Sequence, residues 1–561
     1  MHFKGDVMKT DRRLFFQTIG AGVTGLAMGP AAISMASCSA SRKGDDDQIL
    51  FIGDDVALAE TEYGKVRGYL LRGVYYFLGI PYGADTSGKN RFLPPKKPQP
   101  WNDIFPAVWW GNTAPQFMEG RYGNAYSSFA DHWNYDDVSE DCLRINVFTP
   151  GINDGKKRPV LFWIHGGGFT NGNGIEQDGY NGENMSRYGD VVFCSINHRL
   201  GPIGFTDLSA VGGERFAGSG NAGILDIMAA LEWVHKNIEA FGGDPDNVTI
   251  MGQSGGGAKV CTVVAMPAAK GLVHKAVALS GNITGAIPKD FSEKLGAYIL
   301  KEAGLSPDQI GKLQDMPWKD YLILANRASD KLTRESGGSG MMRGNFGPVA
   351  DGIHIPESMF YSDPDAPSAS IPMILSTTFN EFSPDRLDGS LENITLEGVV
   401  EKLTPRFGED TERIVNGYAA AFPDNRPIEI WSMIISNRQL VVKTAEMKVK
   451  QPAPVYMAWF GWQPPLFDNR MRAFHCLDIC FWFYNTDLML THTGGGSRPR
   501  KLSKLMTDTL IQFMKTGDPN GAGLPEWPQY TSSDGETMIL NDLCEVRSDP
   551  DRDARIFLPP V

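Results

Sequence analysis

Ser254 lies in a segment whose composition and position suit a nucleophile. Residues 252–256 read GQSGG, after an apolar run at 247–251 and before residues 258–264, which can continue as a helix. This pattern between a strand and a helix is typical of a nucleophile elbow, a sharp turn that exposes the serine hydroxyl at the top of a sheet. A β-carbon two residues before or after the serine would clash, so glycine stands at both places. The alternative is a glycine-rich turn with a surface serine, because a chain with 63 glycines contains such patterns by chance.

A nucleophilic serine also needs partners, because its hydroxyl is unreactive at neutral pH. It requires a base, a group that orients the base, and N–H donors for the oxyanion that forms. Residues 165–169 read HGGGF and directly follow an apolar run at 160–164. They match the HGGG-type loop that supplies such donors, so we predict the N–H groups of Gly167, Gly168 and Gly255 as the oxyanion hole. The alternative for HGGGF, a flexible loop, is disfavoured because both motifs follow a strand in the expected order.

The elements that must position these motifs alternate between strand and helix. Helical spacing of apolar residues predicts a helix at 222–241. Strands are predicted at 144–148, 160–164, 190–197, 247–251, 276–280 and 373–376. This order favours a doubly wound α/β fold, with a large, mostly parallel central sheet flanked by helices. Two helical, turn-rich segments, at 282–343 and 385–448, are predicted to cap the side of the sheet where the strands end.

Composition bounds the class of protein. The chain has 561 residues, of which 42% are hydrophobic and 21% charged, which is ordinary globular composition. The formal net charge is −13 and no basic stripe occurs, which excludes nucleic acid as an expected partner. Seven cysteines in a chain of this length do not make a disulfide scaffold. No internal repeat or sharp break in composition divides residues 51–561, so we predict a single domain there.

The N-terminal residues 1–38 resemble an export signal rather than part of the fold. Residues 10–17 (TDRRLFFQ) are similar to a twin-arginine signal, and the uncharged stretch after them suits its apolar core. Residues 35–38 (MASC) resemble a lipobox, which predicts lipidation of Cys38; simple cleavage and an uncleaved anchor are the alternatives. Residues 39–50 suit a polar tether. We therefore expect an exported protein, either periplasmic or a membrane-anchored lipoprotein, that meets the membrane only through this anchor.

Further segments resemble the type-B carboxylesterase family, the cholinesterase-like branch of the α/β-hydrolase superfamily. The resemblance covers nearly the whole chain after the signal. It is carried by the two motifs above and by EDCLRINV at 140–147, NHRLG at 197–201, NAGILD at 221–226, FGGDP at 241–245, FGPVADG at 346–352 and TGDPN at 516–520. It implies an α/β-hydrolase fold with helical cap segments over the active site, and hydrolysis of a small-molecule ester without a cofactor or metal.

The resemblance also assigns the acid and the base. The family's acid follows a strand, and here FNEF at 379–382 follows residues 371–375, which implies Glu381. Taken alone, a glutamate after a strand is more often a solvated loop charge. The family's histidine precedes an acidic-aromatic segment, which implies His475 as general base toward Ser254 and then general acid toward the leaving alcohol. The other histidines are expected to have surface or structural roles, apart from His165 in the HGGGF loop and His2 in the signal.

Three departures from the family pattern qualify the resemblance. Gln253 stands where glutamate is common, which removes a negative charge beside the serine and disfavours cationic substrates such as choline esters. Gly255 stands where alanine is common. Residues 114–116 read APQ, where the family has a cysteine that pairs with the one at Cys142, so Cys142 is expected to be a free, buried thiol. Cys476 and Cys480 are spaced unfavourably for a disulfide, and no zinc site is expected there.

The expected function is therefore an exported serine carboxylic ester hydrolase. It would act through Ser254, His475 and Glu381 and an acyl-enzyme intermediate, on neutral esters. One alternative is a non-catalytic cholinesterase-like binding protein. The other is the same triad acting on amides, thioesters or lactones. Phe169, Phe379, Phe382 and Phe474 are candidate pocket aromatics that could equally belong to the core.

Overall fold

The computed structural model describes residues 48–117, 137–337, 345–386 and 388–561. Residues 49–561 form one compact unit. The predicted signal at 1–38, with Cys38, lies outside the described residues, as do His132 and most of the predicted tether. None of the helices within the described ranges is long and apolar enough to cross a membrane.

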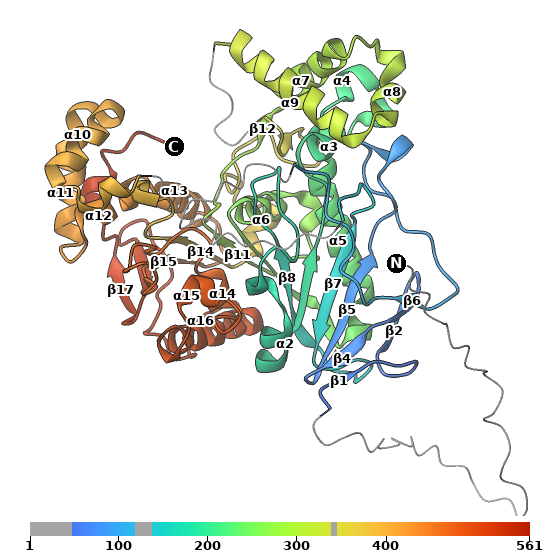
Figure 1. The fold of residues 1–561 in the computed structure, drawn as a ribbon, viewed down its shortest axis with the longest axis horizontal. Coiled ribbons are helices and arrows are strands. Elements are labelled where there is room, and N and C mark those ends of the chain that lie inside the picture. Colours follow the sequence, from blue (N-terminus) through green and yellow to red (C-terminus); the bar gives the residue numbers. More distant parts are fainter. Residues whose placement is uncertain (1–47, 118–136, 338–344, 387) are drawn as a thin grey trace, which may run out of the picture. The chain divides into compact units, whose positions relative to one another are not determined.

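A twelve-stranded sheet forms the centre of this unit (Figure 1). In spatial order its strands are β1 (Leu50–Phe51), β4 (Tyr69–Leu71), β5 (Val74–Pro81), β7 (Arg144–Thr149), β9 (Val192–Ile196), β8 (Arg158–Ile164), β10 (Gly243–Gln253), β11 (Lys275–Leu279), β14 (Met373–Thr378), β15 (Val455–Phe460), β16 (Glu536–Leu540) and β17 (Glu545–Ser548). The pairings from β9 through β16 are parallel, and those toward the two edges are antiparallel. The prediction of a large, mostly parallel central sheet is confirmed.

The helices and the minor strands complete the fold. The helices are α2 (Glu183–Gly189), α3 (Gly201–Phe205), α4 (Ser209–Gly212), α5 (Ala222–Asn237), α6 (Gly255–Ala265), α7 (Lys289–Glu302), α8 (Ile310–Asp315), α9 (Trp318–Glu335), α10 (Leu396–Phe407), α11 (Thr411–Ala421), α12 (Pro427–Ile434), α13 (Arg438–Lys448), α14 (Ile479–Trp482), α15 (Leu490–Thr493), α16 (Ser497–Thr516) and α17 (Arg552–Arg555). Two small sheets are formed by β2 (Leu58–Thr61), β3 (Gly64–Arg67) and β6 (Phe105–Pro106), and by β12 (Ile287–Pro288) and β13 (Val349–Ala350).

The central strands bury side chains on both faces of the sheet. In β8, Phe162 packs in a hydrophobic cluster that includes side chains of α5 and α6. Its neighbour Trp163 packs in a second cluster that includes side chains of α16. Because successive side chains of a strand point to opposite faces, the two clusters are layers of core on either side of the sheet. Helices therefore cover both faces, as the apolar run at 160–164 predicts.

The strand register brings the two sequence motifs together. β8 and β10 run in parallel, with Ile164 opposite Gly252. The HGGGF segment begins at the residue after Ile164, and Ser254 comes two residues after Gly252. Since the carboxyl ends of parallel strands meet at one edge of the sheet, the loop and the serine emerge side by side. β14, which precedes Glu381, lies in the same parallel array and ends at the same edge.

Candidate active site

Ser254 has the backbone conformation of a nucleophile elbow. It connects β10 to α6 with φ 57° and ψ −125°, a conformation that L-residues adopt only under constraint. Its N–H donates to the Leu279 carbonyl at 2.8 Å, which ties the turn to the neighbouring strand β11. A β-carbon at Gly252 would lie 2.5 Å from the Gly256 backbone, and a β-carbon at Gly256 would lie 2.1 Å from the Ile164 oxygen. A larger residue at either position would therefore clash, as the sequence predicts. The turn thus has the strand–serine–helix geometry that the sequence predicts.

Glu381 and His475 form a buried acid–base pair. The His475 Nδ1 atom contacts Glu381 Oε2 in a short hydrogen bond, and since a carboxylate only accepts, Nδ1 carries the hydrogen. The other carboxylate oxygen, Oε1, accepts from the Thr377 hydroxyl and from the Thr378 N–H, the latter at 3.0 Å. This arrangement fixes the imidazole tautomer, with Nε2 left as the proton acceptor.

Both members of the pair have shifted pKa values. Burial would raise the pKa of Glu381, but the charge of His475 and its hydrogen bonds outweigh burial and lower the pKa. Burial would likewise lower the pKa of His475, but the charge of Glu381 and its hydrogen bond act in the opposite direction and raise the pKa well above its ordinary value. The Glu381 carboxylate therefore stabilises the imidazolium that forms when His475 accepts a proton.

Ser254 and His475 open onto one hollow of about 290 Å³, named here the Ser254 hollow. It is lined by Gly168, Phe169, Ser254, Gly255, Ala258, Ser280, Gly281, Phe382, Asn437, Leu440 and His475. Among the described residues, the Ser254 hydroxyl forms no hydrogen bond with the imidazole. Catalytic hydrogen bonds of this kind are often long without substrate and tighten when substrate binds.

The predicted pocket aromatics divide into two groups. Phe169 and Phe382 line the Ser254 hollow, whereas Phe379 and Phe474 belong to the hydrophobic core. Phe382 is 53% exposed, and its ring centroid lies 5.0 Å from that of His475. This ring therefore offers an apolar wall directly beside the catalytic base candidate.

Among the described residues of the two predicted cap segments, those that line the hollow belong to the second. Asn437 and Leu440, at the start of α13, line it, and neither was singled out from the sequence. None of the described residues in the segment 282–343 is among its lining residues. Which cap residues reach the hollow depends on tertiary packing, so no local pattern could have identified them.

Gln253 lies against the imidazole, where the family commonly has a glutamate. Its Nε2 atom is 3.4 Å from each ring nitrogen of His475, and its Oε1 atom accepts from the Cys476 thiol at 3.2 Å. Burial raises the pKa of Cys476, so the thiol stays protonated at neutral pH. The surroundings of the base therefore contain one formal negative charge in direct contact, that of Glu381.

The predicted oxyanion donors lie beside the serine. Gly168 and Gly255 line the Ser254 hollow, and Gly167 is exposed next to Gly168. Within the described part of the chain, the amide N–H groups of these three glycines donate no hydrogen bond. They are therefore free to bind an oxygen of a substrate.

Gly255 is explained by its close approach to Gly168. A β-carbon at Gly255 would lie 2.4 Å from the Gly168 nitrogen and 2.1 Å from the Gly168 oxygen. The alanine that is common in the family could not be accommodated without displacing the HGGGF loop. In this chain, glycine at that place keeps two of the candidate donors in contact.

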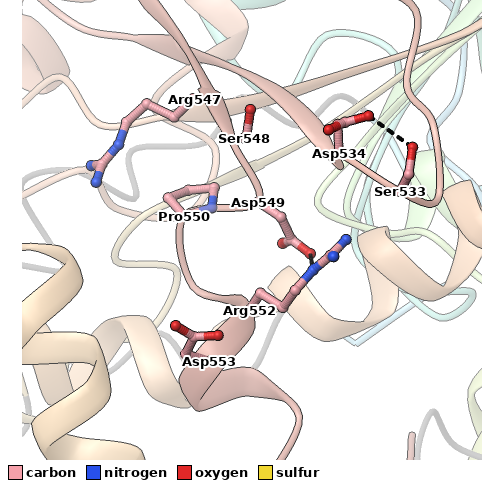
Figure 2. A pocket seen from close by; sticks show the side chains of 8 residues that line it. All are labelled: Ser533, Asp534, Arg547, Ser548, Asp549, Pro550, Arg552 and Asp553. Carbon is pink, nitrogen blue, oxygen red and sulfur yellow. Dashed lines mark hydrogen bonds and ion pairs between the residues drawn. The ribbon is translucent and has the colours of Figure 1, made fainter.

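A second hollow, of about 530 Å³, is larger than the Ser254 hollow, but no histidine lines it (Figure 2). It is lined by Ser533, Asp534, Arg547, Ser548, Asp549, Pro550, Arg552 and Asp553. The Arg552 Nε atom donates to Asp549 at 2.7 Å, and Arg547 donates to the Ala421 carbonyl at 2.9 Å. Its arginines thus already have partners, and no histidine faces its serines.

The remaining described histidines have the structural or surface positions predicted for them. His198 is buried and stacks on His165, His274 accepts from the Val248 N–H at 3.1 Å, and His354 contacts Asp351 at 2.7 Å. His492 is buried against Phe474, and His235 is exposed on α5. None of them lines the Ser254 hollow.

The state of Cys142 agrees with the prediction from the sequence. Cys142 is buried and free, and Cys476 and Cys480 form no disulfide. No cluster of three or more histidine, cysteine or acidic side chains suited to a metal ion occurs in the described ranges.

The chain is similar to known esterases over most of its length. The chain matches the carboxylesterase family over residues 55–404 and 428–553. It is 33% identical to para-nitrobenzyl esterase of Bacillus subtilis (strain 168), over 90% of this chain and 98% of the relative. It is 29% identical to phenmedipham hydrolase of Pseudarthrobacter oxydans, over 86% and 95%. An esterase from Clostridium hathewayi, described as able to hydrolyse aliphatic aromatic polyesters, superposes with a TM-score of 0.77 at 35% identity, over 90% and 98% of the two chains.

The doubly wound sheet and the elbow serine beside a histidine–carboxylate pair define an α/β-hydrolase. Within that class, the chain belongs to the carboxylesterase family, and it is a carboxylic ester hydrolase. Small-molecule esters are accordingly its substrate class.

Proposed function

We propose that this protein is an exported serine esterase that hydrolyses neutral carboxylic esters through Ser254, His475 and Glu381. The observation that carries the proposal is the Ser254 hollow itself. An elbow serine and a carboxylate-bound histidine open onto it, and no lining side chain other than His475 is ionisable.

The proposed mechanism follows from the hydrogen bonds of the pair. His475 Nε2 accepts the Ser254 proton as the hydroxyl oxygen attacks the ester carbonyl. The N–H groups of Gly167, Gly168 and Gly255 hold the oxyanion of the tetrahedral intermediate. His475 returns the proton to the leaving alcohol, and an ester bond to Ser254 remains. A water molecule, deprotonated by His475, then releases the acid and restores the serine.

The preference for neutral esters is supported by Gln253 and by the uncharged lining. A cationic alcohol group would meet neither a carboxylate next to the serine nor one on the wall of the hollow. We expect a 3,3-dimethylbutyl ester to be hydrolysed with a kcat/KM at least about five-fold above that of the choline ester of the same acid, a difference of roughly 1 kcal/mol. The two alcohols have the same shape, because a carbon replaces the charged nitrogen.

Steady-state kinetics with this matched pair of esters, on the wild type and on Gln253→Glu, provides the test. The variant restores a carboxylate beside the serine, so the ratio should shift toward the choline ester. A wild-type enzyme that prefers the choline ester would contradict the proposed selectivity.

Export and lipidation are supported by the sequence at 10–38. In a bacterium with a twin-arginine route, replacing Arg12 and Arg13 together by lysine should leave the tagged full chain in the cytoplasm. Cys38→Ser should abolish incorporation of radiolabelled palmitate without loss of esterase activity. Arg42→Lys, outside the signal, is the matched control and should change neither result. Unchanged fractionation of the double arginine variant would contradict export by this route.

A further inference from the structure

Lys259 is a completely buried lysine beneath the HGGGF loop. It lies on α6, five residues after Ser254, in a helix whose residues are all buried. Its Nζ atom donates to the carbonyl of His165 at 3.1 Å and to the carbonyl of Gly166 at 3.3 Å. The helix that begins at the nucleophile is thus tied to the loop that carries two of the candidate oxyanion donors.

The Gly166 carbonyl belongs to the same peptide group as the Gly167 N–H. No described peptide bond is cis, and in a trans peptide the C=O and N–H bonds point in opposite directions. An amine that holds the Gly166 oxygen from below therefore directs the Gly167 N–H away from the core. Gly167 is exposed whereas Gly166 is buried, which agrees with this orientation.

Gly166 receives a second donor from the same side. The His165 Nδ1 atom lies 3.1 Å from the Gly166 oxygen, and burial lowers the pKa of His165 well below its ordinary value. The imidazole is therefore neutral and donates through Nδ1. Two donors on one carbonyl polarise its peptide group, which makes the N–H at the other end a stronger donor.

A lysine at this position is costly for the fold. A buried ammonium loses its hydration, and it lies in the first half of α6, near the positive end of the helix dipole. Burial lowers the pKa of Lys259 to about 7, although the negative charge of Glu176 acts in the opposite direction. A neutral amine keeps two hydrogens, so both carbonyl contacts persist in either protonation state. A methionine would fill the same space without this cost, which indicates that the contacts themselves are used.

We propose that Lys259 is a positioning residue for the oxyanion hole. It fixes the Gly166–Gly167 peptide group so that the Gly167 N–H faces the oxygen of the tetrahedral intermediate. This inference rests on the proposed role of Gly167 in ester hydrolysis. Lys259 touches no substrate, and it acts through the loop backbone.

The test compares Lys259→Met with the wild type on a neutral aryl ester. Methionine keeps the length of the side chain and removes the donor. We expect kcat to fall about 10- to 100-fold with KM within about three-fold, because oxyanion donors act mainly on the transition state. A trifluoromethyl ketone, which forms a tetrahedral adduct with Ser254, should lose affinity by about the same factor as kcat/KM.

Lys275→Met is the matched control. Lys275 is partly buried and donates to the Asn247 side chain at 2.7 Å, but it lies at the start of β11, the end of the strand opposite the serine. Its replacement should leave kcat and the ketone affinity unchanged. Thermal unfolding of both variants separates loss of positioning from loss of folded protein.

Several outcomes would overturn the inference. A folded Lys259→Met enzyme with wild-type kcat, or one whose KM alone rises, excludes a positioning role. If that variant does not fold, Lys259→Gln, which keeps an N–H donor without the charge, is measured in its place. It should show a smaller loss in the same direction, and wild-type kcat in this variant counts against the inference. Ser254→Ala tests the proposed function separately from the role of Lys259. If Ser254→Ala is active, the proposed function itself is wrong.

Discussion

Replacing Ser254 by alanine is expected to reduce kcat/KM for a simple aryl ester by at least about 10⁴-fold. The substitution removes the atom that forms the acyl-enzyme and leaves the rest of the Ser254 hollow in place. His475 and Glu381 could then act only on water, and the amides of Gly168 and Gly255 would still bind the carbonyl oxygen. The remaining rate is that of an oriented, polarised ester attacked by water.

The same variant should not react with a fluorophosphonate probe, which labels an activated serine covalently. Ser186→Ala is the matched control: the Ser186 hydroxyl is buried on α2 and donates to the Phe148 carbonyl at 3.0 Å, away from the Ser254 hollow. It should keep the wild-type kcat/KM and react fully with the probe. Ester hydrolysis by Ser254→Ala at the wild-type rate, with labelling retained, would mean that another residue is the nucleophile.

Local patterns predict the half of the fold that contains the elbow. The apolar run at 160–164 and the segment at 222–241 are long enough, and periodic enough, to indicate strand and helix. The helix predicted at 222–241 is shorter in the structure: α5 ends at Asn237, and a short 3₁₀ turn, Ile238–Phe241, follows it. The pairings of β5 with β7 and of β3 with β6, by contrast, join segments that are distant in sequence.

The C-terminal strands escape prediction for identifiable reasons. β15 (VYMAWF) is a short, wholly buried apolar run, and periodicity alone cannot separate such a run from a buried helical segment. β17 (EVRS) is at most half-buried and becomes a strand only because it pairs with β16 at the edge of the sheet. Neither segment therefore has a local sequence pattern that clearly indicates a strand.

Some residues of the site also have a local sequence pattern, whereas others do not. Ser254 and the HGGGF loop have patterns that follow from the geometry of a sharp turn and of a close backbone approach. Glu381 and His475 lie far apart in the sequence, and only the family resemblance and the chain order relate them. The bonds from Lys259 to the loop carbonyls are also tertiary, although a lysine inside the apolar segment AKVCTVV is a signal that could have drawn attention to it.

The second large effect is expected at Glu381. Replacement by glutamine should reduce kcat/KM by about 10³- to 10⁴-fold although the side chain keeps its size. The Thr377 hydroxyl and the Thr378 N–H both donate to Oε1, so the amide oxygen of the glutamine must occupy that side. Its NH₂ group then faces His475 Nδ1 as a donor. The imidazole must place its hydrogen on Nε2, and it can no longer accept the serine proton.

The pH profile distinguishes this tautomer effect from simple misfolding. Glu381 raises the pKa of His475, and the base acts only when it is neutral. Wild-type kcat/KM should therefore rise at a higher pH than it would with a histidine of ordinary pKa. Without the carboxylate, the pKa of His475 falls and the acid limb of kcat/KM moves to lower pH. Glu381→Asp keeps the charge but shortens the side chain, so its loss should be smaller and its acid limb should stay above that of Glu381→Gln. A glutamine variant with more than about one tenth of wild-type kcat/KM, or with an unmoved acid limb, would show that another group orients the base.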